Sequence, residues 1–443
     1  EGLLETTFVV ACGEFGRTML TPMPGVASLS TPWCIFCGDL GGIDFGANVV
    51  MFMPLGLGLA MALGRRWKPV LWCFALTVFV EAMQIRIIPG RDASLGDVVA
   101  NTLGGLLGAQ LGLGYSALLR PTRRVARRLA VAWAGLVSVV LWGTSWGFAA
   151  SPRLTSLWVQ HLPVRAGFEP VPGSLDSLWL EGILLDEMYP TNRRAIADAM
   201  AKRSWRAVAA LRMHGPPATP GVIARVVEES TVRLSIEQWG ADLRCRIKSR
   251  ASDIKLRDPV VAVPNVFPVR AGTADVPTRV TCGRLGATML AAATTPSGSS
   301  EYRMRLSPSL GWVMVWPFNV GVTGKVALLG LAWLIALGLP AGYWLAASRW
   351  SPTDRGGGPT PFGALVPAFV VLLAFVLGEY LAPRVFDVEA ASATESLATL
   401  IGIVVGGAVY RLATRARPVP NAEPASVSLR AGGPGFVLPD ESS

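Results

Sequence analysis

Long apolar runs, separated by short polar stretches, occupy both ends of the chain. A helix needs about 20 residues to cross the hydrocarbon core of a bilayer, and seven of the runs approach or exceed that length. An eighth run, residues 8–20, contains Glu14 and Arg17 and is shorter, so the pattern leaves open whether it is a span. The seven expected membrane helices are residues 43–63, 70–88, 98–118, 129–149, 322–347, 362–381 and 393–412.

The middle of the chain follows a different pattern. Between residues 150 and 321, short stretches of alternating apolar and polar positions, such as 233–236 and 243–247, are separated by proline and glycine. Such alternation is typical of β-strands, and a segment of about 170 residues is long enough to form its own core. We therefore expect an all-β domain inserted between membrane helices, with its clearest helix at residues 192–205.

The two membrane regions repeat one another. Shifting the chain by 298 residues without gaps superposes Pro69 on Pro367, Glu81 on Glu379, Arg86 on Arg384, Ser94 on Ser392, Asp97 on Glu395, Gly104 on Gly402 and Gly108 on Gly406. If residues 8–20 form a helix, the chain contains two four-helix units in parallel orientation. The second unit has Thr399 in place of Asn101 and no acid matching Asp92, so we interpret it as a degenerate partner that completes the bundle.

Composition supports a membrane protein. Of 443 residues, 51% are hydrophobic and 16% are charged, and the mean hydropathy is +0.44, which excludes a disordered or ordinary soluble protein. The chain starts at Glu1 without an initiator methionine or a secretory signal, so we expect its first helix to be truncated. The net charge of +10 comes mainly from loops between spans, so it does not indicate a nucleic-acid partner.

The basic residues also predict the orientation. They concentrate on one side of the membrane, in loops that include Arg65, Arg66, Lys68, Arg120, Arg123, Arg124, Arg127 and Arg128. Positively charged loops stay in the cytoplasm, so the β domain is expected outside and the C-terminal tail inside. The expected regions are a first membrane unit (1–118), a basic cytoplasmic loop (119–128), a membrane helix (129–149), the extracytoplasmic β domain (150–321), the remaining helices of the second unit (322–412) and a disordered tail (413–443).

Polar residues gather near the outer ends of the first three spans. Several are spaced three or four residues apart, so they share a helix face, and the loop after the second span adds more. The set is Asp44, Asn48, Glu81, Gln84, Arg86, Arg91, Ser94, Asp97 and Asn101. Ionisable residues within a span are energetically costly and by default indicate a functional site.

Two interpretations of this cluster remain open. In the first, it is a pocket that opens toward the outer leaflet and binds a polar or phosphorylated headgroup, with Arg91 and Arg86 on the anion. Glu81, the deepest acid, or Asp97 would then be the acid or base of any reaction. In the second, the cluster is structural, with Asp97 capping its helix and the amides joining neighbouring helices.

The same residues carry a family resemblance. The sequences CGDLGGIDFGANVVMFMPLG (37–56), EAMQ (81–84) and GRDASLGDVVANTLGGLLG (90–108) resemble the VanZ-like membrane family. Its hallmarks are an Asp and an Asn before a Phe-x-Pro-Leu-Gly run, a Glu-x-x-Gln, and an Arg-x-x-Ser-x-x-Asp-x-x-x-Asn-x-x-Gly. The resemblance implies a multi-pass protein of the bacterial plasma membrane, associated with glycopeptide and especially teicoplanin resistance, and it implies no reaction.

The β domain carries a second resemblance. Residues 221–249 and 309–318 are similar to the concanavalin A-like, laminin-G-type β-sandwich, a jelly roll that often binds glycans. The sequence has no clear cluster of calcium-binding acids there and no pair of catalytic carboxylates. Glycan binding and a structural or partner-docking role therefore both stay open.

Cysteine and histidine give little sign of other chemistry. Cys34 and Cys37 form a CxxC without a βαβ pattern around it, so we expect a loop-closing disulfide or free thiols. Cys245 and Cys282 both lie in the β domain, where they could pair. The two histidines have no metal-ligand spacing and no nucleotide-binding motif is present, so no metal or cofactor is expected.

Three functions fit these patterns. The first is a VanZ-like envelope protein with an outer-leaflet pocket for a lipid, a peptidoglycan precursor or a glycan, and a lectin-like domain above it. The second is a scaffold that displays the β-sandwich, and the third is a lipid transporter or flippase. We do not expect an enzyme; a catalytic version would hydrolyse or transfer a lipid headgroup at the outer leaflet.

Overall fold

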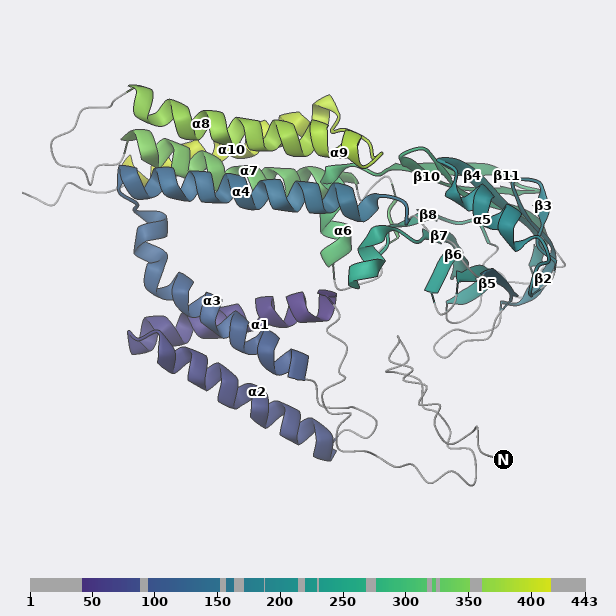
Figure 1. The fold of residues 1–443 in the computed structure, drawn as a ribbon, viewed down its shortest axis with the longest axis horizontal. Helices are drawn as coiled ribbons and strands as arrows, with labels where there is room; N and C mark the ends of the chain where they lie inside the picture. Colours follow the sequence, from purple (N-terminus) through teal and green to yellow (C-terminus); the bar gives the residue numbers. More distant parts are fainter. Residues whose placement is uncertain are drawn as a thin grey trace, which may run out of the picture.

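The structure is a computed structural model that describes residues 42–87, 95–151, 157–162, 171–186, 188–213, 220–228, 231–267, 276–316, 321–323, 327–350 and 361–415. It consists of long helices at one end and a β-sandwich at the other (Figure 1). The helices α4, α7, α8 and α10 lie side by side and carry the sandwich, while α1, α2 and α3 form a separate group.

The long helices match the predicted spans closely. They are α1 (Gly42–Leu63), α2 (Trp67–Ile87), α3 (Leu95–Leu119), α4 (Arg123–Phe148), α7 (Ala327–Trp350), α8 (Pro361–Val376) and α10 (Ala393–Arg415). A π-helical turn, η5 (Leu377–Leu381), continues α8 into α9 (Ala382–Val385).

Six candidate membrane spans are found among the described residues, formed by α1, α3, α4, α7, α8 with its continuation, and α10. The helix α2 has 21 residues, and its role as a seventh span stays a prediction. The possible eighth span, residues 8–20, lies outside the described residues, as does nearly all of the predicted tail.

Glycines allow very close packing between α1 and α3. A Cβ atom at Gly104 would collide with the carbonyl oxygen of Val49, and one at Gly108 with that of Met53. In the opposite direction, a Cβ at Gly56 would collide with the backbone of Gly105. Both helices therefore need glycine at the contact, as expected for spans that associate through small residues.

The same contacts recur between α7 and α10. There Gly402 lies against the carbonyl oxygen of Ile335, Gly406 against that of Leu339, and Gly342 against that of Ile403. The offset of 298 residues relates α3 to α10, and an offset of 286 relates α1 to α7, since Pro54 and Gly56 correspond to Pro340 and Gly342. The repeated residues thus occupy equivalent packing positions in the two helix pairs.

The first three helices join the second group through α3. Its last carbonyl groups, those of Leu118 and Leu119, accept hydrogen bonds from Trp344 Nε1 at 3.0 Å and Tyr343 Oη at 2.6 Å on α7. Within the second group, Trp133 Nε1 on α4 donates to Leu337 O on α7 at 2.8 Å. Aromatic donors thus join the helices, and at the end of α3 they satisfy carbonyls that have no partner within the helix.

The inserted domain consists of two antiparallel sheets. The five-stranded sheet has the order β1 (Leu157–His161), β5 (Gly221–Glu228), β6 (Thr231–Trp239), β7 (Asp242–Ile247) and β8 (Val260–Val263). The six-stranded sheet has the order β11 (Gly298–Arg305), β10 (Thr288–Thr295), β9 (Val276–Leu285), β4 (Ser204–Met213), β2 (Gly173–Leu180) and β3 (Ile183–Leu184). Alternate residues of both sheets point into a shared apolar core.

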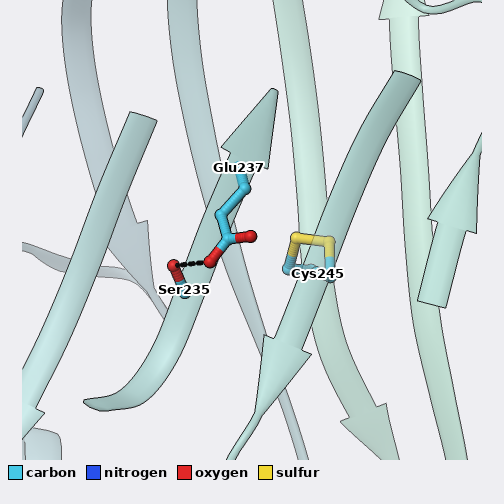
Figure 2. Close-up of a disulfide and its surroundings, with 4 residues drawn as sticks. Ser235, Glu237 and Cys245 are labelled. Carbon is cyan, nitrogen blue, oxygen red and sulfur yellow. Dashed lines mark hydrogen bonds between the residues drawn. A yellow bond between two sulfur atoms is a disulfide. The ribbon is translucent and has the colours of Figure 1, made fainter. Parts of the chain in front are cut away.

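A disulfide crosses this core. Cys245 on β7 is bonded to Cys282 on β9, with the Cα atoms 5.8 Å apart, so the bond joins the two sheets (Figure 2). This pairing agrees with the prediction for these two cysteines. Cys34 and Cys37 lie outside the described residues, and Cys73 is a buried thiol on α2.

Two local expectations were wrong. The predicted helix at 192–205 ends earlier, as α5 (Arg193–Ala201), because Trp205 belongs to β4 and pairs with Arg284 on β9. Val322 does not begin α7 but forms a parallel bridge with Val261 of β8. Between the sandwich and α7, the short helix α6 (Gly311–Val315) carries Trp312, which is 6% exposed and packs with the sandwich core.

Candidate functional site

Polar side chains of three helices meet within the first helix group. Asn48 on α1 donates from Nδ2 to Asp97 Oδ1 on α3 at 2.7 Å. One turn further along α3, Asn101 donates from Nδ2 to Thr77 Oγ1 on α2 at 2.6 Å. The structure thus brings Asn48, Asp97 and Asn101 together with Thr77 in one polar region of the first helix group.

Glu81 lies next to this region and is buried. It follows Thr77 by four residues, so the two share a face of α2, and only 7% of Glu81 is exposed. Asn101 is 6% exposed, and its Oδ1 atom accepts no hydrogen bond from the described residues. The arrangement thus combines a buried carboxyl group with a buried carbonyl acceptor, both of which can interact with hydroxyl or amine donors.

The remaining predicted site residues cannot be assigned contacts. Asp44 lies in the first turn of α1, and Gln84 and Arg86 lie near the end of α2, but their side chains are outside the described part of the chain. Arg91 and Ser94 belong to residues 88–94, which are also outside it. Their membership of the site therefore stays a prediction.

The second helix group has an equivalent polar cluster that is saturated by hydrogen bonds. Glu379, the counterpart of Glu81, is 3% exposed and lies in the π-helical turn η5. It accepts hydrogen bonds from Thr399 Oγ1 at 2.5 Å and Ser396 Oγ at 2.8 Å, both on α10. Thr399 is the counterpart of Asn101, which donates its hydrogen bond to Thr77 in the first unit.

The sandwich itself reaches the counterpart of Asp97. Glu395 accepts hydrogen bonds from Ser307 Oγ at 2.6 Å and Ser309 Oγ at 2.5 Å, both at η3 (Pro308–Leu310), where the sandwich ends. Its second oxygen accepts from Ser392 N at 2.6 Å, and Glu395 N donates to Ser392 Oγ at 3.3 Å. This reciprocal pair is a capping box, so Glu395 also stabilises the N-terminus of α10.

Sequence differences explain why the serines fit there. The 286-residue offset replaces Asp44 with Gly330 and Asn48 with Leu334. A Cβ at Gly330 would lie 3.1 Å from both the carbonyl and hydroxyl oxygens of Ser309, so glycine leaves room for the sandwich. Leu334 cannot donate as Asn48 does, and the serine hydroxyls satisfy the acid instead.

Some of these residues escaped prediction from the sequence. Thr77 was not predicted, although its position four residues before Glu81 in an apolar span was an available signal. Ser307 and Ser309 gave no signal, because their role depends on how the sandwich docks. Within the described ranges, no group of three or more His, Cys, Asp or Glu residues could hold a metal ion.

A separate polar cluster lies on the outer face of the five-stranded sheet. Glu237 on β6 accepts a hydrogen bond from Ser235 Oγ at 2.7 Å (Figure 2). It also accepts one from Trp239 Nε1 at 3.1 Å. Guanidinium nitrogens of Arg225 and Arg246 lie 3.9 and 4.0 Å from the same carboxylate. Because Glu237 is only 1% exposed and already has these donors, its carboxylate is enclosed in the domain and stabilises the sheet.

An arginine at the edge of this cluster is partly desolvated. The Arg244 guanidinium lies 3.9 Å from the centre of the Trp239 ring, a cation–π contact. Burial lowers the pKa of Arg244, although Asp242 and Glu237 act in the opposite direction. Arginine still remains protonated at neutral pH, so the contact persists under physiological conditions.

Comparison with known proteins identifies the first helix group. Residues 10–118 match the family model described as VanZ/LLP1. This range includes α1, α2 and α3 and every polar residue proposed for the first-unit site. No curated protein and no solved structure matches the sequence. Together with the six candidate spans, the match shows a multi-pass helical membrane protein with a VanZ-like domain and an inserted β-sandwich.

Proposed function

We propose that the VanZ-like domain at residues 10–118 binds the polar headgroup of an envelope lipid, a peptidoglycan precursor or a glycan-linked lipid at the outer leaflet. The observation that carries this proposal is the polar region formed by Asn48, Thr77, Glu81, Asp97 and Asn101 within otherwise apolar helices, in which Thr77, Glu81 and Asn101 are buried. Polar groups at such depth are costly, and they persist where they serve helix packing or a ligand.

The comparison of the two units favours a ligand in the first one. In the second unit, Glu379 and Glu395 obtain their hydrogen bonds from threonine and serine hydroxyls of the protein. In the first unit, Asn101 Oδ1 is buried and accepts no hydrogen bond from the described residues. A headgroup rich in hydroxyl groups would supply such a donor.

The loop arginines suit a charged headgroup. Arg86, near the end of α2, and Arg91 lie between Glu81 and Asp97 in the sequence, and guanidinium groups bind phosphate through paired hydrogen bonds. If a reaction occurs, Glu81 is the best candidate for the acid or base because it is a buried carboxyl group. The family resemblance associates such a protein with teicoplanin resistance in the bacterial plasma membrane, with the sandwich outside the cell.

Teicoplanin susceptibility tests this proposal. A sensitive bacterial host would express the wild type, Glu81→Gln, Asp97→Asn or Arg91→Ala at matched membrane levels. We expect the wild type to protect and these variants to lose most of the protection. Glu379→Gln is the matched control, since it changes the equivalent acid in the second unit. Equal protection by all variants would show that the first-unit acids are structural.

A scaffold that displays the sandwich is the alternative. It is favoured by the direct docking of the sandwich on α10 through Ser307, Ser309 and Glu395. In that case, deleting residues 152–318 would abolish function, whereas Glu81→Gln and Asp97→Asn would leave it intact. The same host assay therefore separates the two candidates.

A further inference from the structure

A groove opens between α2 and α3 on the face of the first helix group. Its volume is about 480 Å³, which lies in the range of small-molecule sites, about 300–1,000 Å³. It is lined by Arg66, Trp67, Val70, Leu71, Phe74, Thr102 and Leu106. The Thr102 hydroxyl donates to Val98 O within its own helix at 2.7 Å, so beyond the arginine the groove offers almost only carbon atoms.

Close helix packing places α2 directly against α3 beside this groove. A Cβ at Gly105 would lie 2.6 Å from both the Cβ and the Sγ atoms of Cys73, so the Cys73 side chain packs directly against the backbone of α3 there. On the groove itself, Leu71 and Phe74 remain 55% and 45% exposed. In a bilayer such a surface faces acyl chains, which are as apolar as the groove.

One end of the groove is strongly basic. Arg66 lines it, and the exposed Arg65 and the half-buried Lys68 are its neighbours in sequence. Trp67 is 58% exposed between them, and tryptophan is enriched at the depth of lipid headgroups. The apolar groove and the basic cluster are therefore adjacent, as the acyl chain and the phosphate of a phospholipid are.

The corresponding end of the second unit also has arginines beside a tryptophan, but they are stacked on it. The guanidinium groups of Arg349 and Arg411 lie 4.9 and 3.9 Å from the centre of the Trp350 ring. The second unit keeps an apolar face at the positions that match the groove, since Phe369, Leu372, Leu400 and Val404 are all exposed. In the first unit, Arg66 itself lines the groove, where a guanidinium group can bind an anion.

We propose that the groove between α2 and α3 binds an anionic phospholipid, with an acyl chain along Leu71, Phe74 and Leu106 and the phosphate at Arg65, Arg66 and Lys68. By the charge rule this end of the helices is cytoplasmic, so the lipid belongs to the inner leaflet. The site is distinct from the polar region of Asn48 and Asp97, which lies toward the other end of the helices, and its existence does not depend on the function proposed above.

Native mass spectrometry of the full-length protein tests this proposal. The protein would be released from nanodiscs containing equal amounts of phosphatidylglycerol and phosphatidylcholine with identical acyl chains. We expect phosphatidylglycerol to be retained preferentially by the wild type. In the triple variant Arg65→Ser, Arg66→Ser, Lys68→Ser the preference for phosphatidylglycerol should be lost. Each substitution should lower the ratio of retained phosphatidylglycerol to phosphatidylcholine by about fivefold. Leu106→Trp, which fills the groove, should reduce retention of both lipids.

A matched control separates the groove from general surface charge. Arg124, Arg127 and Arg128 are exposed at the start of α4, on the same side of the helices but not in the groove. Their triple serine variant should keep the preference for phosphatidylglycerol. The proposal is overturned if the wild type retains both lipids equally, which would indicate a neutral lipid surface. It is also overturned if the control triple variant loses the preference as fully as the groove variant.

Discussion

Several polar residues of the helices and of the sandwich form hydrogen bonds with partners that are distant in sequence. Asn48 donates to Asp97, Asn101 to Thr77, and Ser307 to Glu395. Residue spacing predicts that Asp97 and Asn101 share a helix face, but it does not say which helix that face meets. For this reason the positions of the acids and amides could be predicted from the sequence, whereas Thr77 and the sandwich serines could not.

Asp258 provides a residue-scale prediction about pH. Burial raises its pKa from 3.8 to about 6, although Ser249 N and Oγ donate hydrogen bonds to its carboxylate. Because the folded-state pKa is the higher one, the folded state binds the proton more tightly. The free energy of unfolding should therefore fall by about 3 kcal/mol as pH rises from about 4 to about 6. Above the folded-state pKa, Asp258 should cause no further change in stability with pH.

Urea unfolding of the sandwich within the full-length protein, at pH 4.5 and pH 7, checks this expectation. Asp258→Asn should remove most of the difference between the two conditions. Asp253→Asn is the control, because the Asp253 side chain is 40% exposed and pairs with Lys248. An unchanged pH dependence in Asp258→Asn would show that another group is responsible.

Helices of the two units associate through the same glycine positions, and this packing was only partly predictable. The sequence repeat identified Gly104 and Gly108 with their counterparts Gly402 and Gly406. It did not show that α1 and α7 follow a different offset, because the two connecting segments differ in length. An ungapped comparison at a single offset cannot detect that the offset changes from 298 to 286 residues. The glycine contacts between the helices show it directly.

Substitution of these glycines gives an element-scale prediction. Gly104→Ala places a methyl group against the Val49 carbonyl and should lower the stability of the α1–α3 pair by about 1–3 kcal/mol. Gly114→Ala is the control on the same helix, because nothing lies within 4 Å of a Cβ there. Thermal unfolding in detergent would compare them. Equal melting temperatures for the two variants would contradict the packing described for Gly104.

The disulfide gives a second prediction at this scale. It joins positions separated by 37 residues and connects the two sheets, so it restricts the unfolded chain. Replacing Cys245 and Cys282 with alanine should lower the free energy of unfolding of the sandwich by about 4 kcal/mol. Urea unfolding with and without a reductant measures this loss. The double variant should no longer respond to the reductant; a continued response would implicate other cysteines.

At the scale of the whole molecule, the membrane helices could be predicted well from the sequence. The junction, where the sandwich docks on these helices, could not be predicted. Span positions and the sandwich follow from apolar length and from alternation, which are local properties. The docking of the sandwich on the helices depends on contacts such as Arg305 with Glu389 and Ser309 with Glu395. These pairs are more than 80 residues apart, so no local pattern indicates them.

Removing the junction hydroxyls is the prediction for the whole molecule. Ser307→Ala with Ser309→Ala leaves Glu395 without two donors, which should cost about 3 kcal/mol because the acceptor is charged. We expect faster hydrogen exchange at the start of α10 and in η3. Thr295→Ala with Ser297→Ala is the control, since that hydroxyl pair lies on an exposed hairpin. Equal exchange in both double variants would show that other contacts hold the sandwich.

The sandwich begins and ends beside neighbouring strands, and this has a consequence for how such proteins are assembled from parts. Ala150, just after α4, pairs with Ser249 after β7, and Val322, just before α7, pairs with Val261 of β8. Since β7 and β8 are adjacent, entry and exit lie near one another, and α4 and α7 pack together below them. A domain with this geometry can be gained or exchanged by lengthening one interhelical loop, without rearranging the helices that carry it.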